Sequence, residues 1–133
     1  TEKFPEITRI EKAVTDKTGT VHMDITDNCS ATNHLQKYDN IFTSGGSTTQ
    51  VSSIEINELL DSIQPVNYIK IDCEGSEYEI FKNIDESKIG KVGRIVCEVH
   101  GEEIDKFVYS RLLELGFTVK RRENILYAFK KVD

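Results

Sequence analysis

The feature that most constrains this sequence is a strand that breaks at a glycine into a helix, in the stretch YIKIDCEGSEYEIF at residues 68–81. Side chains alternate between the two faces of a strand, so Lys70, Asp72 and Glu74 are expected to share one face. Charged side chains are costly in a buried strand, but the carboxyl ends of strands in open α/β sheets are places where ligands bind. The pattern therefore predicts a functional strand end at Asp72 and Glu74.

A second strand with the same arrangement is predicted at residues 94–101, RIVCEVHG. Its apolar residues alternate with Glu98 and His100, which again lie near the carboxyl end. When two strands are parallel neighbours, their carboxyl ends meet at one edge of the sheet, where ligands tend to bind. We therefore expect Asp72, Glu74, Glu98 and His100 to form one cluster.

The chemistry of such a cluster admits three interpretations. Carboxylates held close together repel one another and invite a cation, so the first is a divalent metal bound by the oxygens of Asp72, Glu74 and Glu98 together with one imidazole. Proton transfer is the second, with His100 as the general base, because the unperturbed pKa of histidine, about 6.5, lies near neutral pH. The third is a structural network of charges, which we favour for Glu77 at the start of the following helix. For Asp72 and Glu98 we expect a functional role.

The rest of the sequence predicts one α/β domain with a mixed, mostly parallel sheet that closes with an antiparallel hairpin. A polar stretch with little periodicity predicts a long loop at residues 26–53. Asn57 is expected to cap a helix, and Ser76 and Glu79 have the spacing of a capping box. The other predicted elements are strands at 7–14, 20–25 and 51–56, helices at 58–63, 76–84 and 104–115, and hairpin strands at 117–120 and 125–129.

Composition restricts the function further. The chain of 133 residues is long enough to bury a core, and its net charge of -6 argues against a protein that neutralises nucleic-acid phosphates. No apolar run approaches the length of a membrane span, about 20 residues. The three cysteines lack the spacing of a disulfide framework, and Cys73 and Cys97 are expected in buried strands. We therefore expect a cytoplasmic protein with neither nucleic acid nor membrane as a partner.

One motif is missing from the sequence. A dinucleotide, or the adenosine part of another cofactor, normally binds at a glycine-rich turn between the first strand and the first helix of the fold. No such turn follows a strand here, and Gly45 and Gly46 lie in the polar loop. The sequence also contains no P-loop, no Cys-x-x-Cys and no nucleophile elbow, so kinase-like, zinc-ribbon and hydrolase functions have no support.

Three segments nevertheless carry a family pattern, in order and in spacing. They are NELL at residues 57–60, YIKIDCEGSEYEIFKN at 68–83 and IVCEVH at 95–100. Together they resemble the FkbM family of S-adenosylmethionine-dependent methyltransferases, which typically shows LDELL, KIDVEGxExxVLKG and an apolar strand that ends in ExH. Ala13 and Val14 lie in a segment similar to the end of the family's third strand.

The resemblance implies a class I, Rossmann-like methyltransferase sheet, in which Asp72 ends the fourth strand and Glu98 the fifth. It also implies methyl transfer from S-adenosylmethionine to an oxygen of a small molecule or sugar. Asp72, Glu98 and His100 would then be catalytic, with His100 or Asp72 as the base. Ala13, Val14 and Asp72 would contact the methyl donor.

The sequence also departs from the family pattern. Asn57 stands in place of an acid, Cys73 in place of valine and Asn83 in place of glycine. More importantly, the family's cofactor turn, VDxGAxxG, and the acid that binds the ribose have no counterpart here. We therefore expect residues 1–133 to form a single domain that is the C-terminal part of a methyltransferase fold, with weak or no catalysis when isolated.

An alternative function of a different class is also consistent with the sequence. A sheet that lacks its first strands has an unpaired edge, and unpaired edges recruit other chains. The alternative is therefore a non-catalytic binding or assembly module, derived from a Rossmann fold, that forms a homo-oligomer through its exposed sheet edge.

Overall fold

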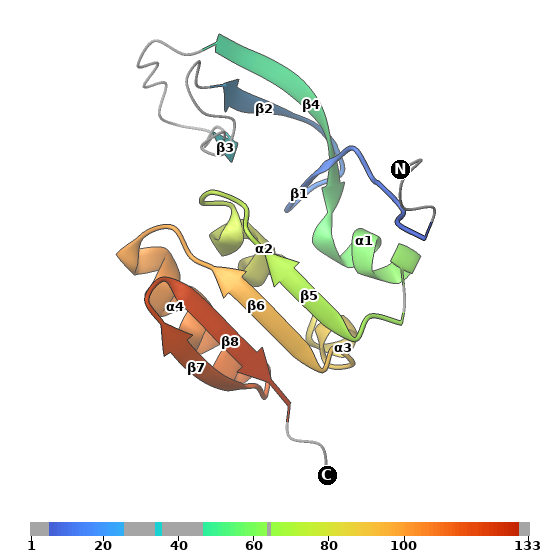
Figure 1. Cartoon of the computed structure of the whole chain (residues 1–133). Coiled ribbons are helices and arrows are strands. Elements are labelled where there is room, and N and C mark those ends of the chain that lie inside the picture. The colour runs from blue at the N-terminus through green and yellow to red at the C-terminus, as the bar shows by residue number, and fades with distance from the viewer. Residues whose placement is uncertain (1–5, 26–33, 36–46, 64, 131–133) are drawn as a thin grey trace.

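The computed structural model of the chain describes residues 6–25, 34–35, 47–63 and 65–130. These residues form two four-stranded sheets and four α-helices (Figure 1). The first sheet comes from the N-terminal part of the chain, and it lies on the side of the molecule toward which β5 (Tyr68–Ile71) and β6 (Arg94–Glu98) of the second sheet point.

The first sheet has the strand order β1-β4-β2-β3. β1 runs parallel to β4, whereas β2 runs antiparallel to both β4 and β3. The strand predicted at 7–14 is therefore wrong over most of its length, because pairing begins only at its end. The bounds are Ala13–Thr15 for β1, Gly19–Ile25 for β2, His34–Leu35 for β3 and Ser47–Glu55 for β4.

β4 corrects the prediction of a loop that extends to residue 53. Thr48, Thr49 and Val51 are β-branched residues, which favour an extended backbone, and the strand pairs with β2 over most of its length. Its polar composition concealed it, because several of its side chains are exposed to solvent. The remaining predicted loop residues, 26–33 and 36–46, lie outside the described residues.

The second sheet has the strand order β5-β6-β8-β7, with β7 at Thr118–Arg122 and β8 at Ile125–Phe129. β5 and β6 are parallel, and the predicted closing hairpin of β7 and β8 is confirmed as antiparallel. The prediction of one mostly parallel sheet is wrong, because the described residues form two sheets, each with one parallel and two antiparallel pairings. In the second sheet the hairpin folds back so that β8 lies against β6.

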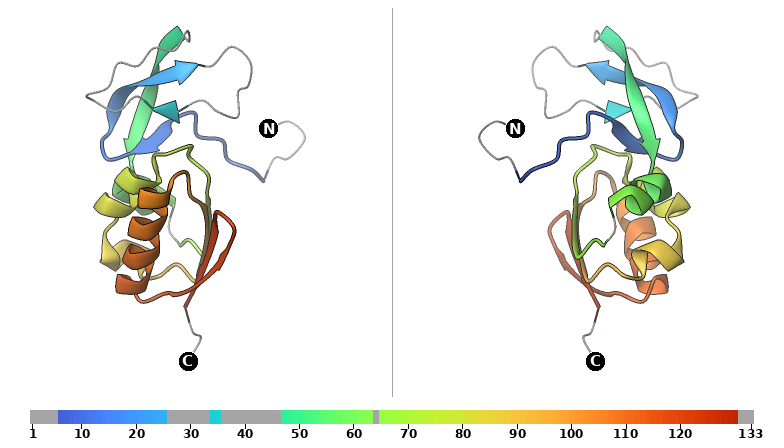
Figure 2. Two further views of the ribbon diagram at one scale, coloured as in Figure 1. Left: turned by 90° about the vertical axis from the view of Figure 1, so that its left-hand side faces the viewer. Right: turned by 90° about the vertical axis from the view of Figure 1, so that its right-hand side faces the viewer.

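The helices cover one face of the second sheet (Figure 2). They are α1 (Ile56–Ile63), α2 (Glu77–Asn83), α3 (Glu86–Ile89) and α4 (Glu102–Glu114). Val14 of the first sheet packs against the hydrophobic core that lies between these helices and the second sheet. Among the described residues, no helix has both the length and the apolar character that crossing a membrane requires. The core between helices and sheet includes Ile80, Phe81, Ile95, Cys97, Val108, Leu112 and Leu126.

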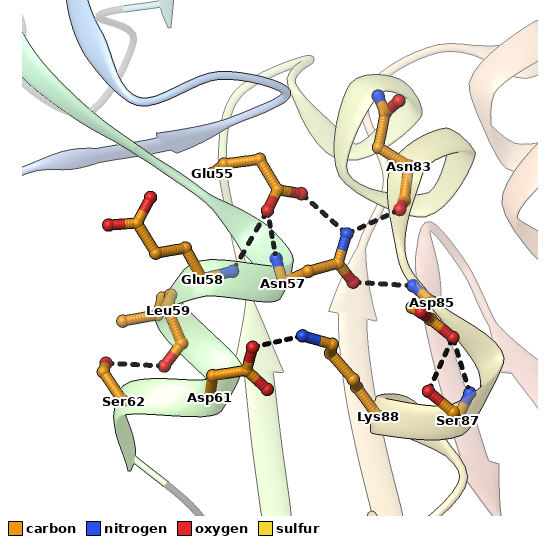
Figure 3. Close-up of polar contacts among 10 residues, drawn as sticks. All are labelled: Glu55, Asn57, Glu58, Leu59, Asp61, Ser62, Asn83, Asp85, Ser87 and Lys88. Atoms are coloured by element: carbon orange, nitrogen blue, oxygen red, sulfur yellow. Dashed lines mark hydrogen bonds and ion pairs between the residues drawn. The ribbon is translucent and has the colours of Figure 1, made fainter.

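Asn57 does not cap α1, contrary to the prediction, because the helix begins one residue earlier. The carboxylate of Glu55 accepts the backbone N–H groups of Asn57 and Glu58 instead, each at 3.0 Å. The side chain of Asn57 donates to Glu55 and to the carbonyl oxygen of Asn83, and it accepts the N–H of Asp85 (Figure 3). It therefore joins α1 to the segment that connects α2 and α3.

The start of α2 also differs from the prediction. The side chain of Ser76 makes no capping hydrogen bond, so the capping box predicted for Ser76 and Glu79 is wrong. The carboxylate of Glu77, the first residue of the helix, accepts N–H groups of the preceding turn instead. The predicted apolar stripe is confirmed, because Ile80, Phe81 and Ile84 are all buried.

Candidate active site

The chain turns sharply after β5. The strand ends at Ile71, and the turn that follows holds two residues at positive φ, Glu74 at 48° and Gly75 at 106°. Positive φ is uncommon for residues other than glycine, so Glu74 departs from strand geometry. The predicted charged face of this strand is therefore reduced to Lys70 and Asp72, whose Nζ and Oδ2 atoms lie 3.1 Å apart.

β6 brings two further polar side chains to the same edge. The alternation predicted for this strand is confirmed, because Cys97 and Val99 are buried, whereas Glu98 and His100 are partly exposed. Oε1 of Glu98 accepts a hydrogen bond of 3.1 Å from Nδ2 of Asn124, which lies in the turn between β7 and β8. The hairpin of β7 and β8 thus fixes the position of the Glu98 side chain.

His100 lies at the centre of the cluster. Its Nδ1 atom is 3.0 Å from Oε1 of Glu77, and its Nε2 atom is 3.4 Å from Oε2 of Glu74. The same Nε2 atom is 3.8 Å from Oε1 of Glu98. The side chain of His100 is 24% exposed; its Nδ1 atom faces the completely buried Glu77, whereas its Nε2 atom lies near the partly exposed carboxylates of Glu74 and Glu98. The structure therefore gathers three carboxylates around one imidazole.

Glu77 is the member of the cluster whose contact with His100 the sequence patterns did not predict. Its side chain is completely buried, and its two oxygens accept the backbone N–H groups of Cys73 and Gly75, each at 3.0 Å. A structural role was expected for Glu77, and these two bonds are of that kind. The position of Glu77, two residues after Gly75, is a sequence signal for these two bonds, because an acid there can reach back to the N–H groups of the turn. It is not a signal for the contact with His100.

The neighbouring carboxylates change the pKa of His100. Burial alone lowers this pKa, but the hydrogen bond to Glu77 and the negative charges of Glu77, Glu74 and Glu98 outweigh burial and raise the pKa above the ordinary value of 6.5. The cluster therefore stabilises the protonated imidazole and makes His100 a stronger base than a free histidine.

The two described cysteines are not activated nucleophiles. Burial, followed by the negative charge of Glu77, raises the pKa of Cys73 to about 11. The same two causes, in the same order, raise the pKa of Cys97 further. The nucleophilic form of cysteine is the thiolate, which is scarce at neutral pH when the pKa is high. Cys73 was predicted in a strand, but it lies in the turn after β5. Cys97 lies in β6, as predicted.

The cluster also contains a set of atoms with the spacing of metal ligands. Asp72, Glu98 and His100 each offer one ligand atom, and these atoms lie within 4.8 Å of one another. Two of the three predicted carboxylate ligands thus come together with the expected imidazole, His100, and Glu74 is not part of the set. The acids also have protein partners, because Asp72 is paired with Lys70 and Glu98 accepts from Asn124.

The three residues expected to contact the methyl donor are divided between the two sheets. Ala13 and Val14 belong to β1 of the first sheet and are partly buried, whereas Asp72 follows β5 of the second sheet. A pocket of about 960 Å³ lies on the second sheet, but at the amino ends of β5 and β6, away from the cluster. Its lining includes Tyr68, Arg94, Tyr127 and Phe129.

Comparison with known proteins gives one result. A family model described as the methyltransferase FkbM domain matches residues 4–119 of the chain. The match includes both strand ends and every residue of the cluster around His100. No curated protein and no solved structure matches the chain.

Proposed function

Because the chain belongs to the FkbM methyltransferase family, we propose that it takes part in methyl transfer from S-adenosylmethionine to a hydroxyl oxygen of a small molecule or sugar. The observation that carries this proposal is the cluster of an imidazole and carboxylates at the carboxyl ends of two parallel, neighbouring strands. Open α/β sheets bind ligands at this position.

His100 is the general base of the proposed reaction. S-adenosylmethionine, when bound, would supply an electrophilic methyl group with a thioether as its leaving group, and the hydroxyl oxygen that gains the methyl group would lose its proton. Nε2 of His100 accepts this proton, since Nε2 is the ring nitrogen that lies beside the partly exposed carboxylates, whereas Nδ1 faces the buried Glu77. Asp72 and Glu98 orient the acceptor, because their carboxylates can accept hydrogen bonds from its hydroxyl groups.

The donor side of the proposed site is incomplete in this sequence. Asp72 stands where the family's fourth strand meets the donor, but no glycine-rich turn follows any described strand. The described residues therefore supply the acceptor side and do not by themselves fit the donor. We propose that residues 1–133 are the C-terminal part of a Rossmann-like fold, a single domain in which Ala13 and Val14 approach the adenine. The parallel unit of β5, α2, α3 and β6 supports this fold.

The experiment that tests the catalytic assignment compares single variants of the full-length protein. Asp72→Ala and Glu98→Ala are each expected to lower kcat by about 10- to 100-fold, because an acceptor hydroxyl that is not held in line reacts slowly. Glu123→Ala is the matched control, because Glu123 is an exposed acid in the turn of the closing hairpin. Unchanged rates in both strand-end variants would show that the assignment is wrong.

A second candidate function, an assembly module, has its own supporting observation. β5 lies at the edge of the second sheet and is hydrogen-bonded to β6 on one side only, among the described residues. Tyr68 in this edge strand is 54% exposed. Edge strands with free N–H and C=O groups pair with strands of other chains. In this alternative the chain forms a homo-oligomer through β5 and needs no methyl donor.

Two measurements on residues 1–133 separate the candidates. Titration calorimetry with S-adenosylmethionine gives saturable heat when a donor site is retained. Light scattering that shows a dimer, together with no heat of binding, favours the assembly module. A Lys70→Pro variant provides a control for the dimer, because proline removes a backbone N–H group from the edge strand and disrupts pairing there.

The proposed location is the cytoplasm, and the proposed partners include neither nucleic acid nor membrane. Cys73 and Cys97 are free thiols, which is typical of proteins in a reducing compartment. The net charge of -6 disfavours binding to nucleic-acid phosphates.

A further inference from the structure

We infer that Glu77 is the residue that positions His100, because it accepts a hydrogen bond from Nδ1 and leaves Nε2 facing the open side of the cluster. This inference rests on the proposed function, in which Nε2 of His100 accepts a proton. Glu77 is a positioning residue and not a catalytic one, since its side chain is completely buried and does not reach an acceptor.

The first argument is the fixed geometry of the Glu77 carboxylate. Oε1 accepts the N–H of Cys73 and Oε2 accepts the N–H of Gly75, each at 3.0 Å. Two backbone donors from one tight turn hold both oxygens, so the carboxylate cannot rotate without losing a bond. The side chain of Glu77 is shielded from solvent and has two backbone partners, so it holds the imidazole of His100 in a fixed position.

The second argument concerns the position of the proton on the imidazole. An ionised carboxylate only accepts hydrogen bonds, so a ring nitrogen that is hydrogen-bonded to it must carry hydrogen. Among the described residues Nδ1 of His100 makes such a hydrogen bond, whereas Nε2 lies only near the oxygens of Glu74 and Glu98, at 3.4 and 3.8 Å. Nδ1 of His100 faces Oε1 of Glu77 at 3.0 Å, which makes Nδ1 the protonated nitrogen of the neutral ring. Nε2 then carries the lone pair, and a lone pair is what a general base requires.

The third argument is where Nε2 points. It lies 3.4 Å from Glu74 of the turn and 3.8 Å from Glu98 of β6, so groups from two elements surround it. Both carboxylates are about one-third exposed, with exposed fractions of 33% for Glu74 and 36% for Glu98. An acceptor that approaches these acids from solvent therefore meets the unprotonated nitrogen of His100. Glu77 sets this orientation from the buried side.

The test is the ¹⁵N spectrum of the His100 ring in the full-length protein at a pH where the imidazole is neutral. The wild-type protein is expected to show a protonated Nδ1 and an unprotonated Nε2. In Glu77→Gln the side-chain amide cannot accept at both positions, so a second tautomer with protonated Nε2 should appear. The value of kcat should fall at least about tenfold, with KM nearly unchanged, because a general base in the wrong tautomer cannot accept the proton.

Glu79→Gln serves as the matched control, since Glu79 lies on the same helix and its buried Oε2 atom has no hydrogen-bond partner among the described residues. This variant should keep the wild-type tautomer and rate. Where Glu77→Gln does not fold, the wild-type spectrum still decides, because protonation at Nε2 overturns the inference.

A variant of His100 separates this inference from the proposed function. When His100→Asn is inactive but Glu77→Gln keeps the wild-type kcat, the positioning role is wrong and the proposed function stands. When His100→Asn keeps the wild-type kcat, the assignment of His100 as the base in the proposed function is wrong, and the positioning role of Glu77 is overturned with it.

Discussion

Nδ1 of His100 lies 3.0 Å from Oε1 of Glu77, although the two residues are 23 positions apart in the chain. The contact joins the first residue of α2, which follows the turn after β5, to the segment that follows β6, and it can form because β5 and β6 are parallel neighbours. The carboxyl ends of both strands thereby become one polar cluster, from which the following predictions are drawn.

The first prediction concerns pH and stability. The pKa of His100 is raised in the folded protein, so folding favours the protonated imidazole. The stabilisation is fully present below the unfolded pKa of about 6.5 and is lost as the pH rises through the folded value. Denaturant unfolding at about pH 5.5 and about pH 9 should show a smaller loss of stability in His100→Asn than in the wild-type protein. Equal losses in the two proteins would contradict the raised pKa.

The second prediction concerns the turn after β5. Gly75 has a φ of 106°, and a Cβ atom added there would meet nothing within 4 Å. Gly75→Ala should therefore lower the free energy of unfolding by about 1 to 3 kcal/mol through backbone strain alone. Gly93→Ala is the control without positive φ, since its nearest neighbour would be the Asn67 carbonyl oxygen at 3.4 Å. Thermal or denaturant unfolding of the two variants gives the comparison, and equal losses would refute the assignment of strain to Gly75.

The third prediction concerns Asn57. Its side chain makes hydrogen bonds of 2.7 Å to Glu55, 2.9 Å to the carbonyl oxygen of Asn83 and 2.7 Å from the N–H of Asp85. Asn57→Ala should destabilise the protein by about 1 to 3 kcal/mol, because all of these bonds disappear at once. Ser62→Ala removes one exposed bond within α1 and should change stability by less than about 0.5 kcal/mol. Denaturant unfolding measures both variants, and equal effects would show that Asn57 does not link α1 to the α2–α3 segment.

The fourth prediction concerns metal. Asp72, Glu98 and His100 have the spacing of metal ligands, but Lys70 and Asn124 already bind the two acids. Because proton transfer through His100 needs no cation, we expect a chelator such as EDTA to leave the rate of methyl transfer unchanged. A loss of rate that Mg²⁺ or Mn²⁺ restores would assign a metal to these residues instead.

Much of the second sheet was predictable from the sequence, because its signals are local. Apolar alternation marks β6, and the closing hairpin follows from two short strands around a polar turn. The end of α4 was also predictable, because glycine commonly follows the last turn of a helix. Gly116 stands just beyond α4 and adopts a φ of 82°. Asp72, Glu98 and His100 were expected to come together for the same reason: each lies at a strand end.

The remaining features depend on geometry that local patterns do not encode. Glu74 was placed on the strand face, but its positive φ turns it out of the strand and toward Nε2 of His100. Ser and Thr residues in β4 resembled a loop because exposed strands tolerate polar side chains. The contact of Glu77 with His100 requires the start of α2 to meet the segment after β6 in space, and neither segment alone indicates it.

The central claim is that His100 is the base of a methyl-transfer site. The most direct test is the rate of acceptor-dependent S-adenosylhomocysteine formation by the full-length protein, with hydroxyl-bearing small molecules and sugars as acceptors. The account predicts measurable turnover in the wild-type protein and a kcat at least about 100-fold lower in His100→Asn. Turnover that is equal in the two proteins would contradict it.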